Sequence, residues 1–389
     1  MNTGRFVLSQ IIDLLHRQSL DRLVERYDAE SKVRHFGCRQ QFICMAFAQL
    51  TWRDGLRDIA TCLNATPSAL YHLGFQRPVA KSTLADANEV RDWRLWQDLA
   101  KSLIRRARDL YAGEDLGVDI ENAVYALDSS TVDLSLTLFP WADFRQTKAG
   151  IKLHTQLDLR GPIPTCIHIT GARQHDVGWL DQLSFERGAF YVVDRGYMDF
   201  ARLNLIAVAG GFFVTRAKTN LRFTRQRSLP VDRLIGLRSD HIGKPTLAKA
   251  RQAYPGLLRK IRYYDSETRK ELVFLTNNLE IPASSVATLY RLRWRIELFF
   301  RWIKGHLRIK HYYGTSPNAV KTQIWIAVIV YLLIAILHKQ LRLPGGLNRT
   351  LQILSVHPFE KIPLNELLAK NTFRTMDDLD RNQLTLWDL

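Results

Sequence analysis

Two carboxylates follow short apolar segments of the kind that form buried strands. Asp128 ends the run Ala123–Leu127, and Asp194 ends the run Ala189–Val193. In open α/β sheets, sites form at strand ends, where side chains emerge from the buried layer. Two neighbouring carboxylates repel each other unless a cation lies between them, and a hard divalent ion with oxygen ligands meets that need. Because Asp is also common in turns after strands, the pair alone leaves a structural interpretation open.

A third carboxylate lies on a predicted basic helix. At about 100° per residue, five polar side chains share an arc of about 80°, apart from an apolar stripe; they are Tyr290, Arg293, Glu297, Arg301 and Lys304. Glu297 has Arg293 and Arg301 four residues away on either side. An ordinary i,i+4 salt bridge is therefore an alternative to a catalytic role.

The spacing of four of these residues carries a resemblance. Tyr290, Arg293, Glu297 and Lys304 are separated by two, three and six residues. This pattern resembles the Tyr-Arg-Glu-Lys signature of bacterial insertion-sequence transposases of the "insertion sequence four" family.

Other segments resemble the same family in the same order along the chain. Leu127–Thr131 resembles the family's first Asp motif, and Val193–Tyr197 resembles its second. Lys152–Gly161 and His168–Asp176 resemble the segment between these motifs, and Phe6–Asn64 resembles the helical N-terminal segment of one branch. The resemblance thus covers most of the chain.

The resemblance implies a ribonuclease-H-like fold with an Asp-Asp-Glu triad at Asp128, Asp194 and Glu297. These carboxylates would hold two Mg²⁺ ions, for which Mn²⁺ can substitute. Two such ions about 4 Å apart activate a water and stabilise the leaving oxygen in phosphodiester cleavage. The enzyme would cut at the ends of its element and join the freed 3′-OH ends to target DNA. No covalent protein–DNA intermediate is needed, which argues against Tyr290 as a nucleophile.

The implied partners are double-stranded DNA and a second copy of the chain. The DNA comprises the terminal inverted repeats of the element and the target, and the second copy would complete a homodimer in the synaptic complex. The implied location is the bacterial cytoplasm, at the nucleoid. We expect DNA contacts from eight residues, namely Tyr290, Arg293, Lys304, Arg301, Arg195, Lys152, His154 and Trp302.

Three of these DNA contacts have particular reasons. Lys152 and His154 share the polar face of a predicted strand. Trp302 lies away from the apolar stripe and could stack on a flipped base, although large aromatics are more often buried, here against the insertion described below.

Composition and periodicity predict the domain organisation. The 389 residues carry a net charge of +17, and residues 221–311 hold 20 Lys and Arg against 7 Asp and Glu, a footprint for a polyanion. The predicted fold is a mixed α/β sheet flanked by helices. The predicted domains are a helical DNA-binding domain (1–118), the core in two parts (119–220 and 282–343), a basic β-rich insertion (221–281) and a C-terminal segment (344–389).

Two further patterns exclude other classes of protein. The four cysteines form no CxxC pair, which disfavours a zinc ribbon and favours a reduced, intracellular setting. Residues 324–337 are fourteen consecutive apolar residues. Because a membrane span needs about 20, we expect a buried core helix there.

Two other functions fit parts of the pattern. A ribonuclease-H-like nuclease or resolvase would cut without joining, and a regulator derived from a transposase would bind DNA without cutting. The basic helix and the long insertion favour a transposase over the first. The presence of all three carboxylates disfavours the second.

Overall fold

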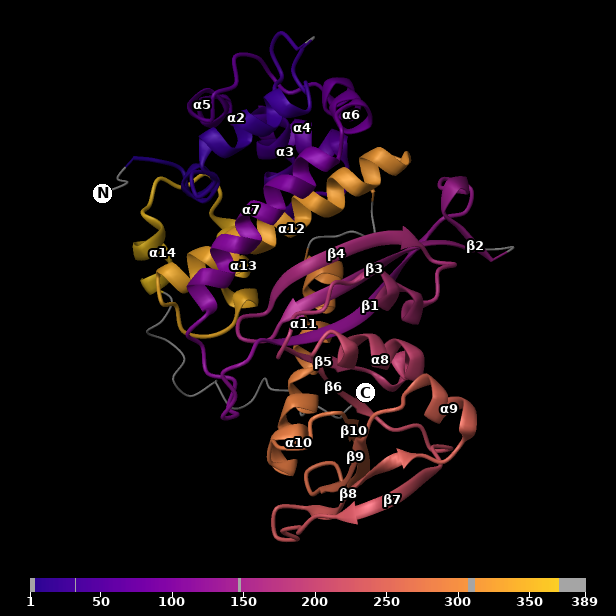
Figure 1. The fold of residues 1–389 in the computed structure, drawn as a ribbon. Coiled ribbons are helices and arrows are strands. Elements are labelled where there is room, and N and C mark those ends of the chain that lie inside the picture. The colour runs from indigo at the N-terminus through magenta and orange to yellow at the C-terminus, as the bar shows by residue number, and fades with distance from the viewer. Residues whose placement is uncertain (1–3, 32, 146–147, 307–311, 371–389) are drawn as a thin grey trace. The chain divides into compact units, whose positions relative to one another are not determined.

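The computed structural model describes residues 4–31, 33–145, 148–306 and 312–370. The chain forms two compact units (Figure 1). The helical unit contains Met1–Tyr111, Val132–Ala149 and Phe300–Leu389, and the sheet unit contains Ala112–Thr131 and Gly150–Phe299. Residues 371–389 of the predicted C-terminal segment lie outside the described residues.

The N-terminal part of the helical unit has the helices expected from the apolar spacing, with α6 as an addition. They are α1 (Val7–Ile12), α2 (Arg17–Arg26), α3 (Cys38–Thr51), α4 (Leu56–Asn64), α5 (Pro67–His72), α6 (Lys81–Val90) and α7 (Arg94–Tyr111). The later part contains η1 (Pro140–Ala142), α12 (Pro317–Gln340), α13 (Leu347–Val356) and α14 (Leu364–Lys370).

Helix α12 forms the core of the helical unit. The Ser316 side chain caps its first turn by accepting from the Ala319 N–H, and Pro317 occupies the first helical turn. The helix packs against α3, α6 and α7 (Figure 1). It is long and apolar enough to cross a membrane, but 94% of its most apolar 18-residue stretch is buried inside the protein. The prediction of a buried core helix is confirmed.

The chain contains a ten-stranded mixed sheet, most of which belongs to the sheet unit. Its strands are β1 (Val124–Leu134), β2 (Asp143–Arg145), β3 (Lys148–Asp158), β4 (Ile163–Gly171), β5 (Phe190–Val193), β6 (Phe212–Arg216), β7 (Phe223–Ser228), β8 (Leu237–Pro245), β9 (Leu258–Asp265) and β10 (Lys270–Thr276). The order is β2-β3-β1-β5-β6-β10-β9-β8-β7, with β4 paired to β3. Strands β1, β5 and β6 are parallel, and β3 and β4 form the predicted antiparallel hairpin. The predicted mixed α/β fold is confirmed.

Short helices connect and cover the strands. They are η2 (Asp176–Gln182), η3 (Arg195–Tyr197), α8 (Phe200–Val208), α9 (Ala248–Ala253), α10 (Ala283–Leu292) and α11 (Trp294–His306). Side chains of β1 and β5 alternate between the two faces of the sheet. Leu127 and Val193 belong to a buried cluster with Leu203 and Ile206 of α8. Asp128 and Asp194, one residue further along, therefore point to the opposite face, where α10 contacts β5 and β6.

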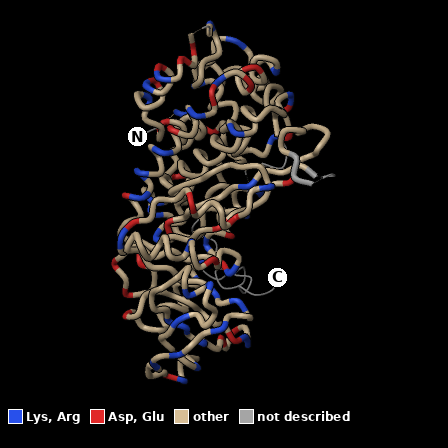
Figure 2. The backbone as a smooth tube through the Cα atoms, turned by 45° about the vertical axis from the view of Figure 1, so that its right-hand side comes forward, with Lys and Arg blue, Asp and Glu red and all other residues tan. Residues whose placement is uncertain are grey.

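The segment predicted as a β-rich insertion adds strands to the same sheet. Strand β10 pairs antiparallel with β6, and β9, β8 and β7 follow in turn. Lys and Arg recur along these strands (Figure 2). One charged pair is sealed inside, because Arg259 and Asp240 are 5% and 2% exposed and are joined by two hydrogen bonds of 2.9 and 2.6 Å.

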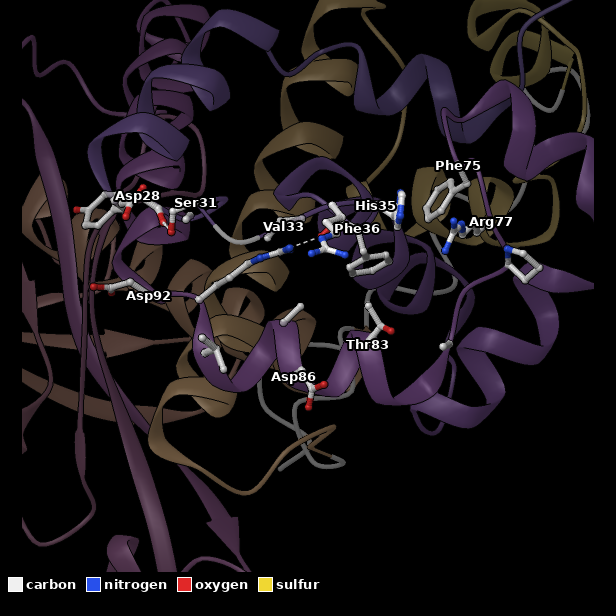
Figure 3. Close-up of a pocket in the computed structure, with 18 residues that line it drawn as sticks. Asp28, Ser31, Val33, His35, Phe36, Phe75, Arg77, Thr83, Asp86 and Asp92 are labelled. Atoms are coloured by element: carbon white, nitrogen blue, oxygen red, sulfur yellow. Dashed lines mark hydrogen bonds between the residues drawn. The ribbon is translucent and has the colours of Figure 1, made fainter.

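A pocket of about 790 Å³ lies in the helical unit between residues 28–36 and α6 (Figure 3). His35, Phe36, Phe75 and Arg77 gather at one end, and Asp28 and Asp92 lie toward the other (Figure 3). Arg91 of the lining donates to the Phe36 carbonyl. The lining therefore mixes both signs of charge, and no sequence pattern had indicated this pocket.

Candidate active site

The parallel strands bring the first two carboxylates together. Leu127 pairs with Val193, and Val193 pairs with Thr215. The residues that follow are Asp128, Asp194 and Arg216. Because β1, β5 and β6 are parallel, these three side chains lie on one face of the sheet, side by side toward the carboxyl ends of the paired strands. Strand β1 itself continues to Leu134, so Asp128 does not end its strand as predicted. The pairing of β1 with β5 ends at Leu127 and Val193, so Asp128 is the first residue of β1 beyond that pairing.

Two helices rather than one cover this edge. The sequence predicts one basic helix that carries Tyr290 and Lys304, but α10 ends at Leu292 and α11 begins at Trp294. At the junction the Arg293 N–H donates to the Tyr290 carbonyl and the Ile296 N–H donates to the Arg293 carbonyl. These i,i+3 bonds tighten the turn and interrupt the α-helical ladder at Arg293.

The helix pair contacts all three carboxylates. The Tyr290 hydroxyl donates to Asp194 Oδ1 at 3.1 Å. Arg293 Nη2 lies 2.6 Å from Glu297 Oε1, and Arg293 Nη1 lies 3.6 Å from Asp128 Oδ2. The i,i+4 salt bridge considered from the sequence is therefore present, and it forms part of the carboxylate cluster. The structure thus brings Asp128, Asp194 and Glu297 together around Tyr290 and Arg293.

The electrostatics of the cluster are unbalanced. Burial, together with the negative charges of Glu297 and Asp194, raises the pKa of Asp128 to about 6, although the Ser129 N–H and Arg293 oppose the shift. Burial and the nearby Asp194 also raise the pKa of Tyr290 to about 12. Tyr290 therefore holds its proton at neutral pH. Asp128 and Glu297 share the Arg293 guanidinium while the charge of Asp194 also acts on Asp128, and such an excess of negative charge stabilises a divalent cation.

A second polar network adjoins Asp128. Ser129 Oγ donates to Asp176 Oδ1 at 2.5 Å, and Lys152 Nζ lies 2.8 Å from the same oxygen. Burial alone would raise the pKa of the Asp176 carboxyl, but the bonds from Lys152 and Ser129 lower it below its ordinary value. The network fixes the backbone just after Asp128, because Ser129 also donates its N–H to Asp128 Oδ1.

The strand face that carries Lys152 and His154 is covered rather than open. His154 is fully buried, bonds to Thr170 Oγ1 at 3.0 Å and packs on Trp179. Burial lowers its pKa to about 4. A DNA contact by His154 would require it to leave this packing, and Lys152 is committed to Asp176 and to the Gln174 carbonyl.

The other predicted DNA contacts occupy different surroundings. Arg195 is exposed in η3, directly after Asp194. Arg301 and Lys304 lie in the part of α11 that belongs to the helical unit, where Arg301 is exposed and Lys304 is half-buried. Trp302 is buried and packs edge-on against Tyr331 of α12, at 4.6 Å between ring centroids. This ring contact is with a core helix, and the burial weighs against base stacking, which stays a prediction.

The carboxylates suit a hard divalent cation in type and in charge. As placed, however, no three His, Cys, Asp or Glu side chains in the described part of the chain form a group that could hold a metal ion. Arg293 bonds to two of the triad carboxylates instead. The donor set therefore fits the ion chemically, and in this structure Arg293 contacts two of its three carboxylates.

Sequence reasoning assigned no role to three residues beside the cluster. Arg216 ends β6 next to Asp194, and its positive charge acts on the Tyr290 phenol. The sequence did contain a sign of Arg216. It follows the strand-like run Gly211–Thr215, just as Asp128 and Asp194 follow their apolar runs. Ser129 and Asp176 had been quoted only as parts of motifs, since their contact joins residues 47 positions apart.

Comparison with known families assigns the chain to a family. A family model described as the transposase DDE domain matches residues 121–333, more than half of the chain, and this range contains all three carboxylates. The chain belongs to the transposase DDE domain family. A second model, for a domain of unknown function (DUF4372), matches residues 3–76 and precedes the DDE domain.

Curated relatives of this DDE domain protein carry transposase names. "Putative transposase y4zB" of Sinorhizobium fredii is 36% identical over 234 residues, which cover 59% of this chain and 63% of the relative. "Probable transposase for insertion sequence element IS5377" of Geobacillus stearothermophilus is 29% identical over 55% of this chain and 56% of its own length. "Transposase InsG for insertion sequence element IS4" of Escherichia coli is 25% identical over 49% and 46%. The match thus spans less than two thirds of these relatives.

Proposed function

We propose that this protein is a DNA transposase that cuts at the ends of its insertion sequence and joins the 3′-OH ends to target DNA. The observation that carries the proposal is that the charges of both Asp194 and Glu297 act on Asp128, while Tyr290 bonds to Asp194 and Arg293 contacts Glu297 and Asp128. Membership of the DDE domain family and the names of the relatives support it.

Asp128, Asp194 and Glu297 would hold two Mg²⁺ ions, for which Mn²⁺ would substitute. Such ions, when bound, activate a water or a 3′-OH and stabilise the leaving oxygen. The chain supplies the rest. Arg216, Arg293 and Tyr290 would orient the scissile phosphate, since an arginine offers a fork of N–H donors to phosphate oxygens. Tyr290 keeps its proton and donates a hydrogen bond to Asp194, so we infer that it serves as a positioning group and not as a nucleophile.

The proposed substrate is double-stranded DNA, both the terminal repeats of the element and the target site, inside a bacterial cell. Residues 221–311 carry 20 basic and 7 acidic side chains, and a charge of this sign and size favours a polyanion. Because joining requires two ends at once, we propose a homodimer in the synaptic complex.

Joining separates this proposal from a nuclease that only cuts. The assay supplies pre-cut element ends bearing a free 3′-OH, a supercoiled target plasmid and Mg²⁺. The proposal predicts covalent joining of both ends to the target by the purified full chain, and no joining by a variant in which Glu297 is changed to Gln. If the protein cuts intact ends but never joins pre-cut ends, the transposase proposal is wrong and the protein is a nuclease that only cuts.

A further inference from the structure

Arg293 occupies the position where the triad needs positive charge. Its guanidinium bonds to Glu297 at 2.6 Å and lies 3.6 Å from Asp128, while the third carboxylate, Asp194, accepts from Tyr290. The side chain is only 14% exposed and lies over the Tyr290 ring at 5.6 Å from the centroid. Among the described residues, therefore, each carboxylate of the triad is already engaged by Tyr290 or Arg293.

This arrangement conflicts with cation binding at the same carboxylates. A guanidinium has donors but no lone pair to offer a metal ion, and the Glu297 oxygen that it occupies is a ligand in the proposed function. A divalent ion beside an unmoved Arg293 would also be repelled by a like charge at a partly buried site, where screening by water is weaker. The two cations compete for the same oxygens.

We propose that Arg293 is the resident cation of the metal-free triad, and that a divalent ion binds only by displacing it from Glu297 and Asp128. This inference rests on the proposed function, because it takes those two residues as ligands. The displaced guanidinium would then be free to meet the negatively charged phosphate.

Local features allow Arg293 to move. It lies at the junction between α10 and α11 and outside both helices. Its Nε is buried and has no hydrogen-bond partner among the described residues. Among the described residues, the ion pairs of the guanidinium are thus made by its Nη atoms, and these are the contacts that an arriving cation would break.

Metal binding without DNA tests the exchange. Free Mn²⁺ is counted by electron paramagnetic resonance during titration of the full chain, as wild type, as Arg293→Gln and as Arg293→Lys. Glutamine removes the competing charge, so its Mn²⁺ affinity should rise roughly tenfold, the size expected for about 1.4 kcal/mol of relieved repulsion. Lysine keeps the charge and serves as the matched control, within about threefold of wild type. An Arg293→Gln affinity equal to or weaker than wild type would overturn the inference.

The same titration on Glu297→Gln separates the two proposals. Loss of Mn²⁺ binding there supports Glu297 as a ligand. Unchanged binding there contradicts the triad of the proposed function, whatever the Arg293 variants do. If Arg293→Gln does not fold, the wild-type chain still gives an answer by nuclear magnetic resonance of its arginine Nε–H signals. The Arg293 signal, assigned by its absence in Arg293→Lys, should shift when Mg²⁺ is added, and an unmoved signal at saturating Mg²⁺ contradicts displacement.

Discussion

Two arginine–carboxylate pairs in the sheet unit differ in how completely their charges are matched. Arg259 and Asp240 form a one-to-one pair with two hydrogen bonds and almost no exposure. Arg293 instead contacts both Glu297 and Asp128, and Asp194 lies nearby. The side chains of Glu297 and Asp128 remain 33% and 21% exposed. A sealed and balanced pair stabilises a fold. A partly open cluster with excess negative charge is suited to bind a cation and a substrate.

The largest expected effect comes from removing a charge at the open cluster. Changing Asp194 to Asn keeps an acceptor for Tyr290 but removes a ligand charge. We expect DNA cleavage to fall by at least roughly a thousandfold, about 4 kcal/mol in activation free energy. The free energy of unfolding should change by less than about 1 kcal/mol. Asp199→Asn, in the N-cap of α8, is the matched control, because Asn caps helices as well as Asp does. Equal loss of cleavage in both variants would contradict the assignment.

The sealed pair should show the opposite pattern. Changing Asp240 to Asn leaves the Arg259 charge buried without its partner, and we expect a loss of 3–5 kcal/mol in the free energy of unfolding, to order of magnitude. Urea denaturation measures it. The double change Asp240→Leu with Arg259→Met removes both charges and should recover most of the stability. An Asp240→Asn variant as stable as wild type would show that the pair is not structurally important.

The buried His154 gives a pH effect on stability. Its folded pKa is lowered to about 4 by burial, while the unfolded chain keeps an ordinary value. Between about pH 6.5 and 4 the unfolded state binds a proton that the folded state does not, so stability falls as the pH falls through this window. The loss attributable to His154 is at most about 3 kcal/mol. Stability measured from pH 7 to 4 should depend less on pH in His154→Gln than in wild type. His175→Gln, at an exposed site, should follow wild type; identical curves for all three proteins would refute the effect.

The smallest expected effect concerns Arg216, which sequence reasoning did not assign. Changing it to Gln should lower cleavage roughly tenfold, about 1.4 kcal/mol, through a lost phosphate contact. Stability should not change, because Arg216 is half-buried and forms no side-chain hydrogen bond or ion pair with a described residue that a glutamine would leave unpaired. Arg269→Gln, in the exposed turn between β9 and β10, is the control and should cleave like wild type. A stronger effect at Arg269 than at Arg216 would contradict a role for the end of β6.

Much of the fold followed from local patterns. The alternation of polar and apolar residues predicted β3 and β4, because such alternation is typical of strands with one apolar face. The apolar runs before Asp128 and Asp194 predicted the core of β1 and β5, because strands buried on both faces are continuously apolar. The fourteen-residue apolar run predicted the core of α12. The joining of residues 300–389 to the N-terminal helices in one compact unit could not be predicted, since it depends on packing between segments far apart in sequence.

The candidate site was predictable in its residue types but not in its contacts. The motif spacing indicated Asp128, Asp194 and Glu297, and the helical wheel placed Arg293 beside Glu297. The periodicity did not reveal the break at Arg293, because both sides of it remain helical. Nor did it reveal that the polar face of β3 is buried at His154, since the covering residue Trp179 comes from η2.

The central claim is that Asp128, Asp194 and Glu297 form one metal-dependent catalytic site. Strand cleavage tests it most directly. Labelled DNA bearing the ends of the flanking element is incubated with wild-type protein or with Glu297→Gln, in Mg²⁺ or in EDTA. We predict release of a 3′-OH at the element boundary only by wild type in Mg²⁺, with DNA binding retained by the variant. Equal cleavage by Glu297→Gln, or cleavage in EDTA, would contradict the claim.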